Sequence, residues 1–263
     1  MYRICVFMAM VLMLIIVSLS SHSAVIAIVD YADEWNKQAC LGPLLNDLKQ
    51  KYDDVTSKVE KGELSLDGYK MLMIGSFTTN NPTLHNSLDK SAAKIEAFLA
   101  NGGVVVELTQ ADQNQASIDW LPKPLGATRT DLDYAQIIIL EKNHAIFNKP
   151  NKLGEAELSG WGIKSGGWST AWETFNNAHS SMTVLAANNA QATNPCILEG
   201  KYKNGRVLLL SIALDKKHVL GTTPASIENS MKMMENIIAE YMPLSVENKG
   251  KITTAWGEIK KAR

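Results

Sequence analysis

Polar side chains that could bind a ligand follow the ends of four apolar runs in this sequence. The runs cover residues 25–29, 71–75, 104–108 and 206–213, and the polar residues that follow them are Asp30, Ser76, Thr109, Gln110, Asp215 and His218. Hydroxyl, carboxyl, amide and imidazole groups can together hydrogen-bond a small polar ligand such as a sugar. The same residue types also cap helices and close turns, so a purely structural role stays open for each of them.

A second candidate surface lies between Gly160 and Trp172, where three Trp and four Gly occur within 13 residues. Aromatic side chains on a Gly-rich loop can stack on sugar rings or anchor a protein partner. They can equally cover the core beneath a long loop. We select Trp168 as the candidate ligand-binding residue of this segment.

No residues have the spacing of a metal site or a nucleotide site. The sequence has no C-x-x-C, H-E-x-x-H, phosphate loop or G-x-S-x-G elbow, so we expect no metal and no cofactor. Cys40 and Cys196 stand 156 positions apart. Two separate buried thiols are a slightly better interpretation than a disulfide between them.

Composition and charge indicate an ordinary globular protein. The 263 residues are 46% hydrophobic and 20% charged, with a formal net charge of −1. A disordered, collagen-like or disulfide-dense chain has a different composition. Nucleic-acid binding normally needs a basic excess, so we expect no nucleic-acid partner.

The first 24 residues have the order of an export signal. Arg3 supplies a positive charge, residues 4–17 are apolar, and residues 18–24 contain the small residues at which a signal peptidase cuts. An uncleaved membrane anchor is the alternative, but the apolar run is shorter than the roughly 20 residues that span a bilayer. We therefore expect an exported protein, periplasmic or extracellular, that contacts a membrane only if this segment stays attached.

Apolar runs separated by helix-length segments predict an α/β fold with a mostly parallel sheet. In the first half, strands are expected at residues 25–29, 54–59, 71–75 and 104–108, with helices at 33–52 and 87–101. In the second half, strands are expected at 135–140, 182–187, 196–202 and 206–213. Asn204-Gly205 predicts a hairpin, and Pro224 begins a helix that runs to Tyr241 with its Met residues in the core. The resulting organisation is a signal segment at 1–24, one domain at 25–243 and a basic tail at 244–263.

Three segments resemble class I glutamine amidotransferase-like domains, namely residues 25–30, 66–75 and 95–106. The succession of Asp67-Gly68-Tyr69, a strand, a helix, Phe98-Leu99, Gly102-Gly103 and a further strand is most similar to the trehalose-utilisation-like branch. Residues 143–150 and 204–210 look like later elements of that branch. The resemblance covers about residues 25 to 241. It implies a flavodoxin-like, three-layer sandwich of the class I amidotransferase type.

The resemblance also implies where a nucleophile would lie. Active members of the family carry a Cys on a sharp turn after the strand that matches residues 103–108, and a His and an acid follow the last strands. The matching position here is Thr109, with no Cys near it, while Asp215 and His218 lie about where the acid and the His would come, at a different spacing. We therefore expect no glutaminase activity, since a Thr nucleophile without an N-terminal amine is rare.

Two functional hypotheses follow. The favoured one is a secreted, catalytically degenerate domain that binds a small polar ligand, a glycan or a protein partner. The alternative is a hydrolase of a carbohydrate or an amide that uses the region of Thr109, Asp215 and His218. The hydrolase requires these groups to come within hydrogen-bond reach of one another.

Overall fold

The main sheet has eight strands in the described part of the chain. The structure is a computed structural model that describes residues 25–34, 37–108, 118–160, 171–176, 178–216 and 224–242. The sheet order is β2-β1-β3-β4-β10-β9-β8-β6. In chain order these strands are β1 (Ile26–Val29), β2 (Tyr52–Asp54), β3 (Met71–Ile74), β4 (Val104–Leu108), β6 (Ile138–Ile139), β8 (Met182–Ala187), β9 (Pro195–Tyr202) and β10 (Gly205–Leu210).

The sheet is mixed but mostly parallel, which confirms the predicted fold class. Strands β2, β1, β3, β4 and β10 run parallel to one another. Strands β9, β8 and β6 continue the sheet in antiparallel pairs. The expected signal segment 1–24 and the tail 244–263 lie outside the described residues. Within the described residues, no helix combines the length and the apolar character that crossing a membrane requires.

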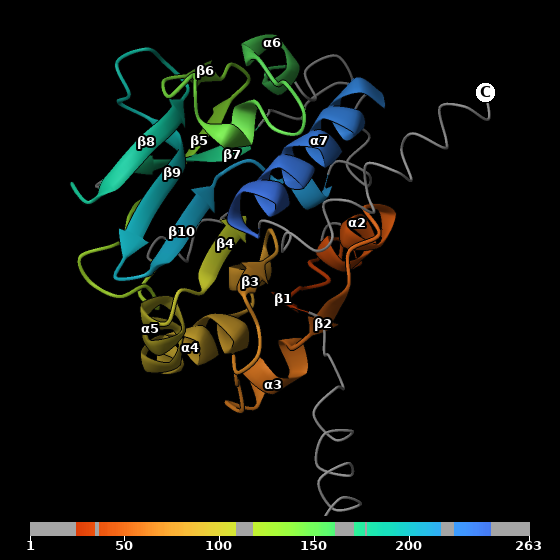
Figure 1. Cartoon of the computed structure of the whole chain (residues 1–263), viewed down its shortest axis with the longest axis vertical. Helices are drawn as coiled ribbons and strands as arrows, with labels where there is room; N and C mark the ends of the chain where they lie inside the picture. The colour runs from red at the N-terminus through yellow and green to blue at the C-terminus, as the bar shows by residue number, and fades with distance from the viewer. Residues whose placement is uncertain are drawn as a thin grey trace, which may run out of the picture.

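Each face of the sheet carries its own core, because successive side chains of a strand point to opposite faces. Ile26 and Ile28 of β1 belong to one core, and Ala27 and Val29 belong to the other. The first face packs against α2 (Leu41–Asp47), α6 (Glu155–Leu158), α7 (Pro224–Tyr241) and the 3-10 turn η2 (Ala145–Phe147). The second face packs against α3 (Thr56–Glu60), α4 (Pro82–Lys90) and α5 (Ala92–Ala100). In Figure 1, α3, α4 and α5 lie together, apart from the long helix α7.

A two-stranded antiparallel ribbon accompanies the main sheet and is not predicted from the sequence. It pairs β5 (Thr128–Tyr134) with β7 (Ala171–Asn176), and β7 contacts β9. The sequence TRTDLDY of β5 is polar, so it lacks the apolar run that predicts the other strands. Residues 171 and 172 belong to β7 rather than to the expected loop, and the strand expected at 135–140 is reduced to β6.

Two predictions in the first half of the chain are wrong in extent. The helix predicted at 33–52 covers only Leu41–Asp47, and Pro43 lies in its first turn, where a backbone N–H is not required. The strand predicted at 54–59 is wrong, because strand β2 covers Tyr52–Asp54 and helix α3 covers Thr56–Glu60. The Oδ1 atom of Asp54 accepts a hydrogen bond of 2.9 Å from the N–H of Thr56, which starts helix α3.

The helix predicted at 87–101 begins earlier and is broken into α4 and α5. Asn81 caps α4 by accepting hydrogen bonds from the N–H groups of Thr83 and Leu84, and Pro82 occupies the first turn. Ser91 ends α4 and precedes α5, with ψ near zero. Both helices contribute buried residues to the core of the second face.

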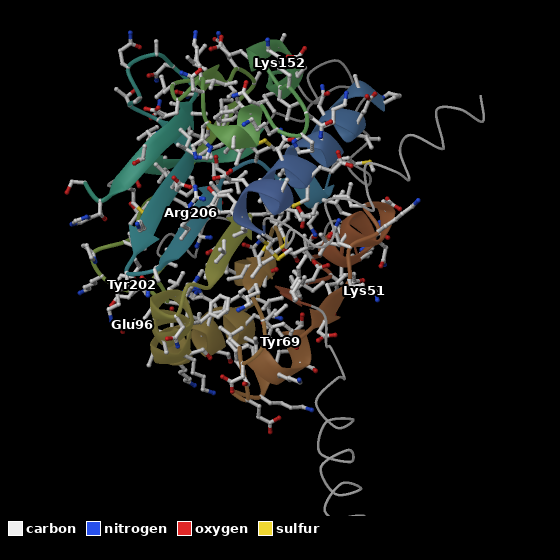
Figure 2. All side chains as sticks on the ribbon, in the orientation of Figure 1. Lys51, Tyr69, Glu96, Lys152, Tyr202 and Arg206 are labelled. Atoms are coloured by element: carbon white, nitrogen blue, oxygen red, sulfur yellow. The ribbon has the colours of Figure 1, made fainter. Side chains whose placement is uncertain are left out.

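The hairpin and the last helix are confirmed. Strands β9 and β10 pair from Gly205 opposite Tyr202, and α7 covers Pro224–Tyr241 as predicted. Gly205 is needed for close packing, because a Cβ atom there would lie 2.3 Å from the carbonyl oxygen of Leu99. The hydroxyl of Tyr202 donates a hydrogen bond to Glu96, which ties the hairpin to α5 (Figure 2).

Candidate ligand-binding site

Asp30 directly follows β1, and its carboxylate accepts hydrogen bonds from the first turn of α2. Its Oδ1 atom accepts hydrogen bonds from the N–H groups of Tyr31 at 3.0 Å and Cys40 at 3.4 Å, and its Oδ2 atom accepts one from Gly42 at 3.0 Å. The residue is only 5% exposed. Asp30 therefore has the helix-capping role that the sequence left open. This long-range contact also sets the start of α2, which explains why the local pattern misplaced it.

Ser76 and Asp215 meet at the carboxyl edge of the sheet. Ser76 follows β3, and Asp215 lies in the 3-10 turn η4 (Leu214–Lys216) that follows β10. The Oδ2 atom of Asp215 accepts a hydrogen bond of 3.0 Å from the N–H of Ser76. Both residues are buried, with exposed fractions of 0% and 1%.

One polar atom on each of these side chains is left over. Ser76 Oγ and Asp215 Oδ1 are buried and have no hydrogen-bond partner among the described residues. Folded proteins pair the large majority of their buried polar side-chain atoms, because an unpaired one costs roughly 1–3 kcal/mol. These two atoms therefore require a partner that the described residues do not supply.

Gly75, the residue between β3 and Ser76, lets two carboxylates approach the same stretch of backbone. A Cβ atom on Gly75 would lie 2.9 Å from Asp30 Oδ1 and 3.2 Å from Asp215 Oδ2. Any larger residue would press on both acids. The sequence separates Asp30 from Asp215 by most of the chain, and the fold brings them together here.

Lys216 supplies positive charge beside these acids. It is completely buried, and its Nζ atom lies 3.0 Å from Asp33 Oδ2 in an ion pair whose partners are 0% and 1% exposed. Burial lowers the pKa of Lys216, but the charges of Asp215 and Asp33 outweigh this effect and raise it, so the ammonium group stays charged. Neither Lys216 nor Asp33 is among the residues selected from the sequence, although Lys216 directly follows Asp215.

The titration of Asp30 is set by the same neighbours. Burial raises the pKa of Asp30 to about 6, and the charge of Asp215 adds to the rise. The N–H of Gly42 and the charge of Lys216 act in the opposite direction. Burial also raises the pKa of Cys40 to about 11, so its thiol stays neutral. Cys40 and Cys196 are both free and buried, which agrees with the interpretation of two separate thiols.

The turn after Ser76 is strained. Phe77 has a φ of 63° and a ψ of 1°, a left-handed conformation that costs a bulky residue about 1–2 kcal/mol. The Lys216 ammonium lies 5.8 Å from the centre of the Phe77 ring, within range of a cation–π interaction. Strain of this kind persists where the surrounding structure enforces it, and it is frequent at ligand sites.

A second buried polar cluster lies on the second face of the sheet, next to the β5–β7 ribbon. The indole N–H of Trp120 donates a hydrogen bond of 3.2 Å to Glu107 Oε2, and Arg129 donates one of 3.0 Å to Thr79 Oγ1. Burial raises the pKa of Glu107 to about 7, while the Arg129 charge and the Trp120 hydrogen bond oppose the rise. Glu107 lies inside the apolar run 104–108, whose pattern indicates core, so the sequence pattern does not mark it as a functional residue.

The structure brings together three of the seven residues selected from the sequence. Asp30, Ser76 and Asp215 converge around Gly75. The other four selected residues, Thr109, Gln110, Trp168 and His218, lie outside the described residues. Of the Thr109, Asp215 and His218 group, the structure therefore describes only Asp215.

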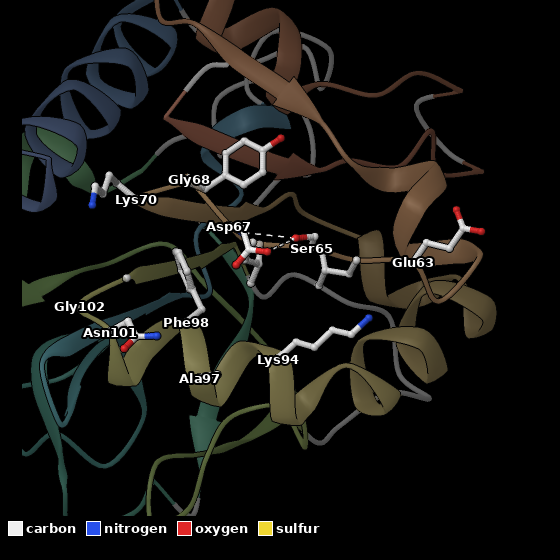
Figure 3. A pocket seen from close by; sticks show the side chains of 14 residues that line it. Glu63, Ser65, Asp67, Gly68, Lys70, Lys94, Ala97, Phe98, Asn101 and Gly102 are labelled. Atoms are coloured by element: carbon white, nitrogen blue, oxygen red, sulfur yellow. Dashed lines mark hydrogen bonds between the residues drawn. The ribbon is translucent and has the colours of Figure 1, made fainter. Parts of the chain in front are cut away.

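A separate groove lies at the opposite, amino edge of the sheet. It has a volume of about 680 Å³ and runs between residues 63–70 and the last turns of α5 (Figure 3). Its floor is Leu64, Leu66 and Phe98, all buried, and its walls carry exposed side chains including Asp67 and Lys94. None of the Asp30, Ser76 and Asp215 cluster lines this groove.

Among the described residues, no group of three or more His, Cys, Asp or Glu side chains is arranged to hold a metal ion. His85 lies 3.6 Å from Asp89 and packs edge-on against Trp120. His144 lies 3.6 Å from Glu199, and His179 contacts the Ser181 hydroxyl at 2.9 Å. Each of these three His residues thus has a local structural partner.

Comparison with known proteins supports the fold. No protein-family model matches the sequence, and no curated protein matches it significantly. Its structure is similar to that of a GMP synthase-type protein from Thermoplasma acidophilum, with a TM-score of 0.53 and 14% identity over 91% of this chain and 98% of the other. It is also similar to a glutamine amidotransferase from Thermotoga maritima, with a TM-score of 0.51 and 13% identity over 84% and 99% of the two chains.

These likenesses define the class of the fold. The chain has a class I glutamine amidotransferase-like fold, an α/β flavodoxin-like sandwich. At identities this low the likeness extends to the fold alone, because one fold hosts many functions.

Proposed function

We propose that this chain is an exported amidotransferase-like domain without glutaminase activity, which binds a small polar ligand at the carboxyl edge of its sheet. The binding residues are Ser76 and Asp215, and Asp30 and Lys216 set the charge around them. The signal-like order of residues 1–24 supports export. The absence of a Cys near Thr109 supports the loss of glutaminase chemistry. The segments at 66–75 and 95–106 favour the trehalose-utilisation-like branch.

One observation carries the binding proposal. Ser76 Oγ and Asp215 Oδ1 are buried, unpartnered among the described residues, and attached to residues that are already joined by a hydrogen bond. Asp30 has its carboxylate filled by backbone N–H groups, so it is a supporting residue rather than a free acceptor. A ligand would contact the two unfilled atoms first.

The position of the two atoms agrees with the general rule for this architecture. In open α/β sheets, ligands bind in the crevice outside the carboxyl ends of the parallel strands. Ser76 follows the carboxyl end of β3, and Asp215 follows that of β10. A carboxylate oxygen can accept a hydrogen bond, and a Ser hydroxyl can donate or accept one, so the pair suits a ligand rich in hydroxyl or amine groups.

The test is a binding measurement by saturation-transfer NMR on a panel of monosaccharides, polyols and amino polyols. We expect at least one compound to bind the wild-type protein and to bind Ser76→Ala about threefold to tenfold more weakly, the value of one hydrogen bond. Asp67→Asn is the matched control, because Asp67 lies in the groove at the other edge. It should leave the affinity unchanged.

Either of two outcomes would contradict the proposal. One is that no compound of the panel binds the folded wild-type protein, in which case Ser76 Oγ and Asp215 Oδ1 hold internal water only. The other is that binding survives in Ser76→Ala and is lost in Asp67→Asn. That result would move ligand binding to the groove at the amino edge.

A further inference from the structure

Acidic groups outnumber basic groups around Ser76 and Asp215. Asp30, Asp33 and Asp215 bring three carboxyl groups to the neighbourhood, and Lys216 brings one ammonium group. Lys216 is paired with Asp33 at 3.0 Å. Lys216 also interacts with the charge of Asp215, so a single ammonium group balances two carboxylates, and Asp30 adds a third carboxyl group beside Asp215.

Burial makes this imbalance costly. Asp30, Asp33 and Asp215 are each at most 5% exposed, so bulk water screens their charges poorly. The protein relieves part of the cost by proton uptake, since the pKa of Asp30 is raised to about 6 by burial and by Asp215. A cation that reached Asp215 Oδ1 would relieve it more directly.

The available atoms decide what kind of cation fits. The described residues offer no group of three or more His, Cys, Asp or Glu side chains arranged for a metal ion. At this edge Asp215 Oδ1, Ser76 Oγ and Lys216 Nζ are buried without a hydrogen bond among the described residues, and Lys216 is ion-paired with Asp33. The remaining carboxylate oxygen and hydroxyl together suit an ammonium group with a hydroxyl beside it. Phosphate and carboxylate ligands would bring a further negative charge next to Asp215 and Asp30 and would be repelled.

We propose that the ligand of the Ser76–Asp215 site is a hydroxylated organic amine, bound through its ammonium group at Asp215 Oδ1 and through a hydroxyl at Ser76 Oγ. This inference rests on the proposed function and specifies the charge of the ligand. Asp215 acts as the counter-ion and Ser76 orients the hydroxyl, while Lys216 shares its single positive charge between Asp33 and Asp215.

The experiment compares three compounds that share a six-carbon hydroxylated chain and differ at one end. Glucamine ends in an ammonium group, sorbitol in a hydroxyl and gluconate in a carboxylate. Isothermal titration on the full-length protein at neutral pH should rank them glucamine, sorbitol, gluconate. We expect glucamine to bind at least about tenfold more tightly than sorbitol, as is typical of a hydrogen bond to a charged group.

Three variants assign the ranking to the site. Asp215→Asn should remove the preference for glucamine, because it removes the counter-ion while keeping an oxygen for the N–H of Ser76. Ser76→Ala should weaken all three compounds and keep their order. Asp67→Asn removes a carboxylate from the distant groove and should change nothing. If Asp215→Asn fails to fold, the wild-type ranking still decides the question.

Acid should weaken glucamine binding to the wild-type protein. Between pH 7 and pH 5 Asp30 takes up a proton, which removes one negative charge from the site. Of the other groups that act on Asp30, Asp215 is the counter-ion and Lys216 stays protonated, while Cys40 is a neutral thiol and Asp33 is paired with Lys216. An affinity for glucamine that rises on acidification would overturn the inference.

The outcomes separate the two proposals. If none of the three compounds binds but another compound of the monosaccharide and polyol panel does, only the inference about charge fails. If no compound of either set binds, the proposed function itself fails. If sorbitol or gluconate binds as tightly as glucamine, only the inference about charge fails, and a neutral or anionic ligand takes its place. If glucamine binds preferentially and Asp215→Asn retains that preference, the cation lies elsewhere on the protein and the inference is overturned.

Discussion

Two buried carboxyl groups, one on each face of the sheet, take up protons more readily in the folded protein than in the unfolded chain. Burial raises the pKa of Asp30 from 3.8 to about 6 and that of Glu107 from 4.5 to about 7. Asp30 borders helix α2 of the first core, and Glu107 contacts Trp120 of the second. A group with a raised pKa in the folded state favours folding below its unfolded pKa and loses that contribution as the pH rises through its folded pKa.

Replacement of Glu107 by Gln should flatten the dependence of stability on pH. The wild-type protein should lose about 3 kcal/mol of stability through Glu107 between pH 4.5 and pH 7, because each pKa unit corresponds to about 1.4 kcal/mol. Gln keeps an oxygen for Trp120 and does not ionise. Urea unfolding of both proteins at pH 5 and pH 8 measures the difference. Equal pH dependence in the two proteins would show that Glu107 ionises normally.

Loss of the Asp30 side chain should destabilise the protein through helix α2. Asp30→Ala leaves the N–H groups of Cys40 and Gly42 without their acceptor, and we expect a cost of about 2 kcal/mol, at the upper end for a lost cap. Asp30→Asn keeps one acceptor oxygen and should cost less. Thermal unfolding of both variants gives the order. A larger loss in Asp30→Asn than in Asp30→Ala would contradict the capping role.

At the scale of elements, the strands and helices that coincide with clear apolar patterns were predicted well, and those that depend on tertiary contacts were not. Strands β1, β3, β4 and β8, the β9–β10 hairpin and helix α7 follow from local patterns of apolar residues, Pro and Gly. The start of α2 depends on Asp30, ten residues before Cys40 in the chain, so no local pattern contains it. The ribbon strand β5 owes its shape to pairing with β7, some forty residues later, and its own sequence is polar.

Some residues of the candidate site could be predicted from local sequence patterns, and others could not. The polar residues at strand ends could be selected because a parallel sheet gathers these ends at one edge. Local sequence patterns could not select Asp33 and Lys216, or the need for a small residue at Gly75, because these residues matter only through contacts between distant parts of the chain. Only the three-dimensional structure shows that the carboxylate of Asp30 is hydrogen-bonded, while one oxygen of Asp215 has no hydrogen-bond partner among the described residues.

Gly205→Ala should be more destabilising than Gly62→Ala. A Cβ atom at Gly205 would lie 2.3 Å from the Leu99 carbonyl oxygen and 2.6 Å from that of Gly103, so backbone must move, at a cost of about 2–3 kcal/mol. Gly62 has a φ of +74° with nothing within 4 Å, so its cost is the backbone term of about 1 kcal/mol. Urea unfolding compares the two. The reverse order would show that the β10–α5 contact is loose.

At the scale of the whole molecule, opposing titrations should place maximal stability at mildly acidic pH. Although burial raises the pKa of Glu199, hydrogen bonds from His144, Tyr241 and Arg206 outweigh it and lower the pKa to about 2. Stability from Glu199 is therefore lost as the pH falls from 4.5 towards 2. Asp30 and Glu107 lose theirs as the pH rises towards 7. Unfolding measured from pH 3 to pH 8 should give a maximum at about pH 4. A maximum above pH 7 would contradict these shifts.

The most direct test of ligand binding at the carboxyl edge is a crystal structure of the protein soaked with glucamine. We expect the ammonium group within hydrogen-bond distance of Asp215 Oδ1 and a hydroxyl at Ser76 Oγ, with the Asp33–Lys216 ion pair intact. Glucamine bound between Asp67 and Phe98, or ordered water alone at Ser76 and Asp215, would contradict it.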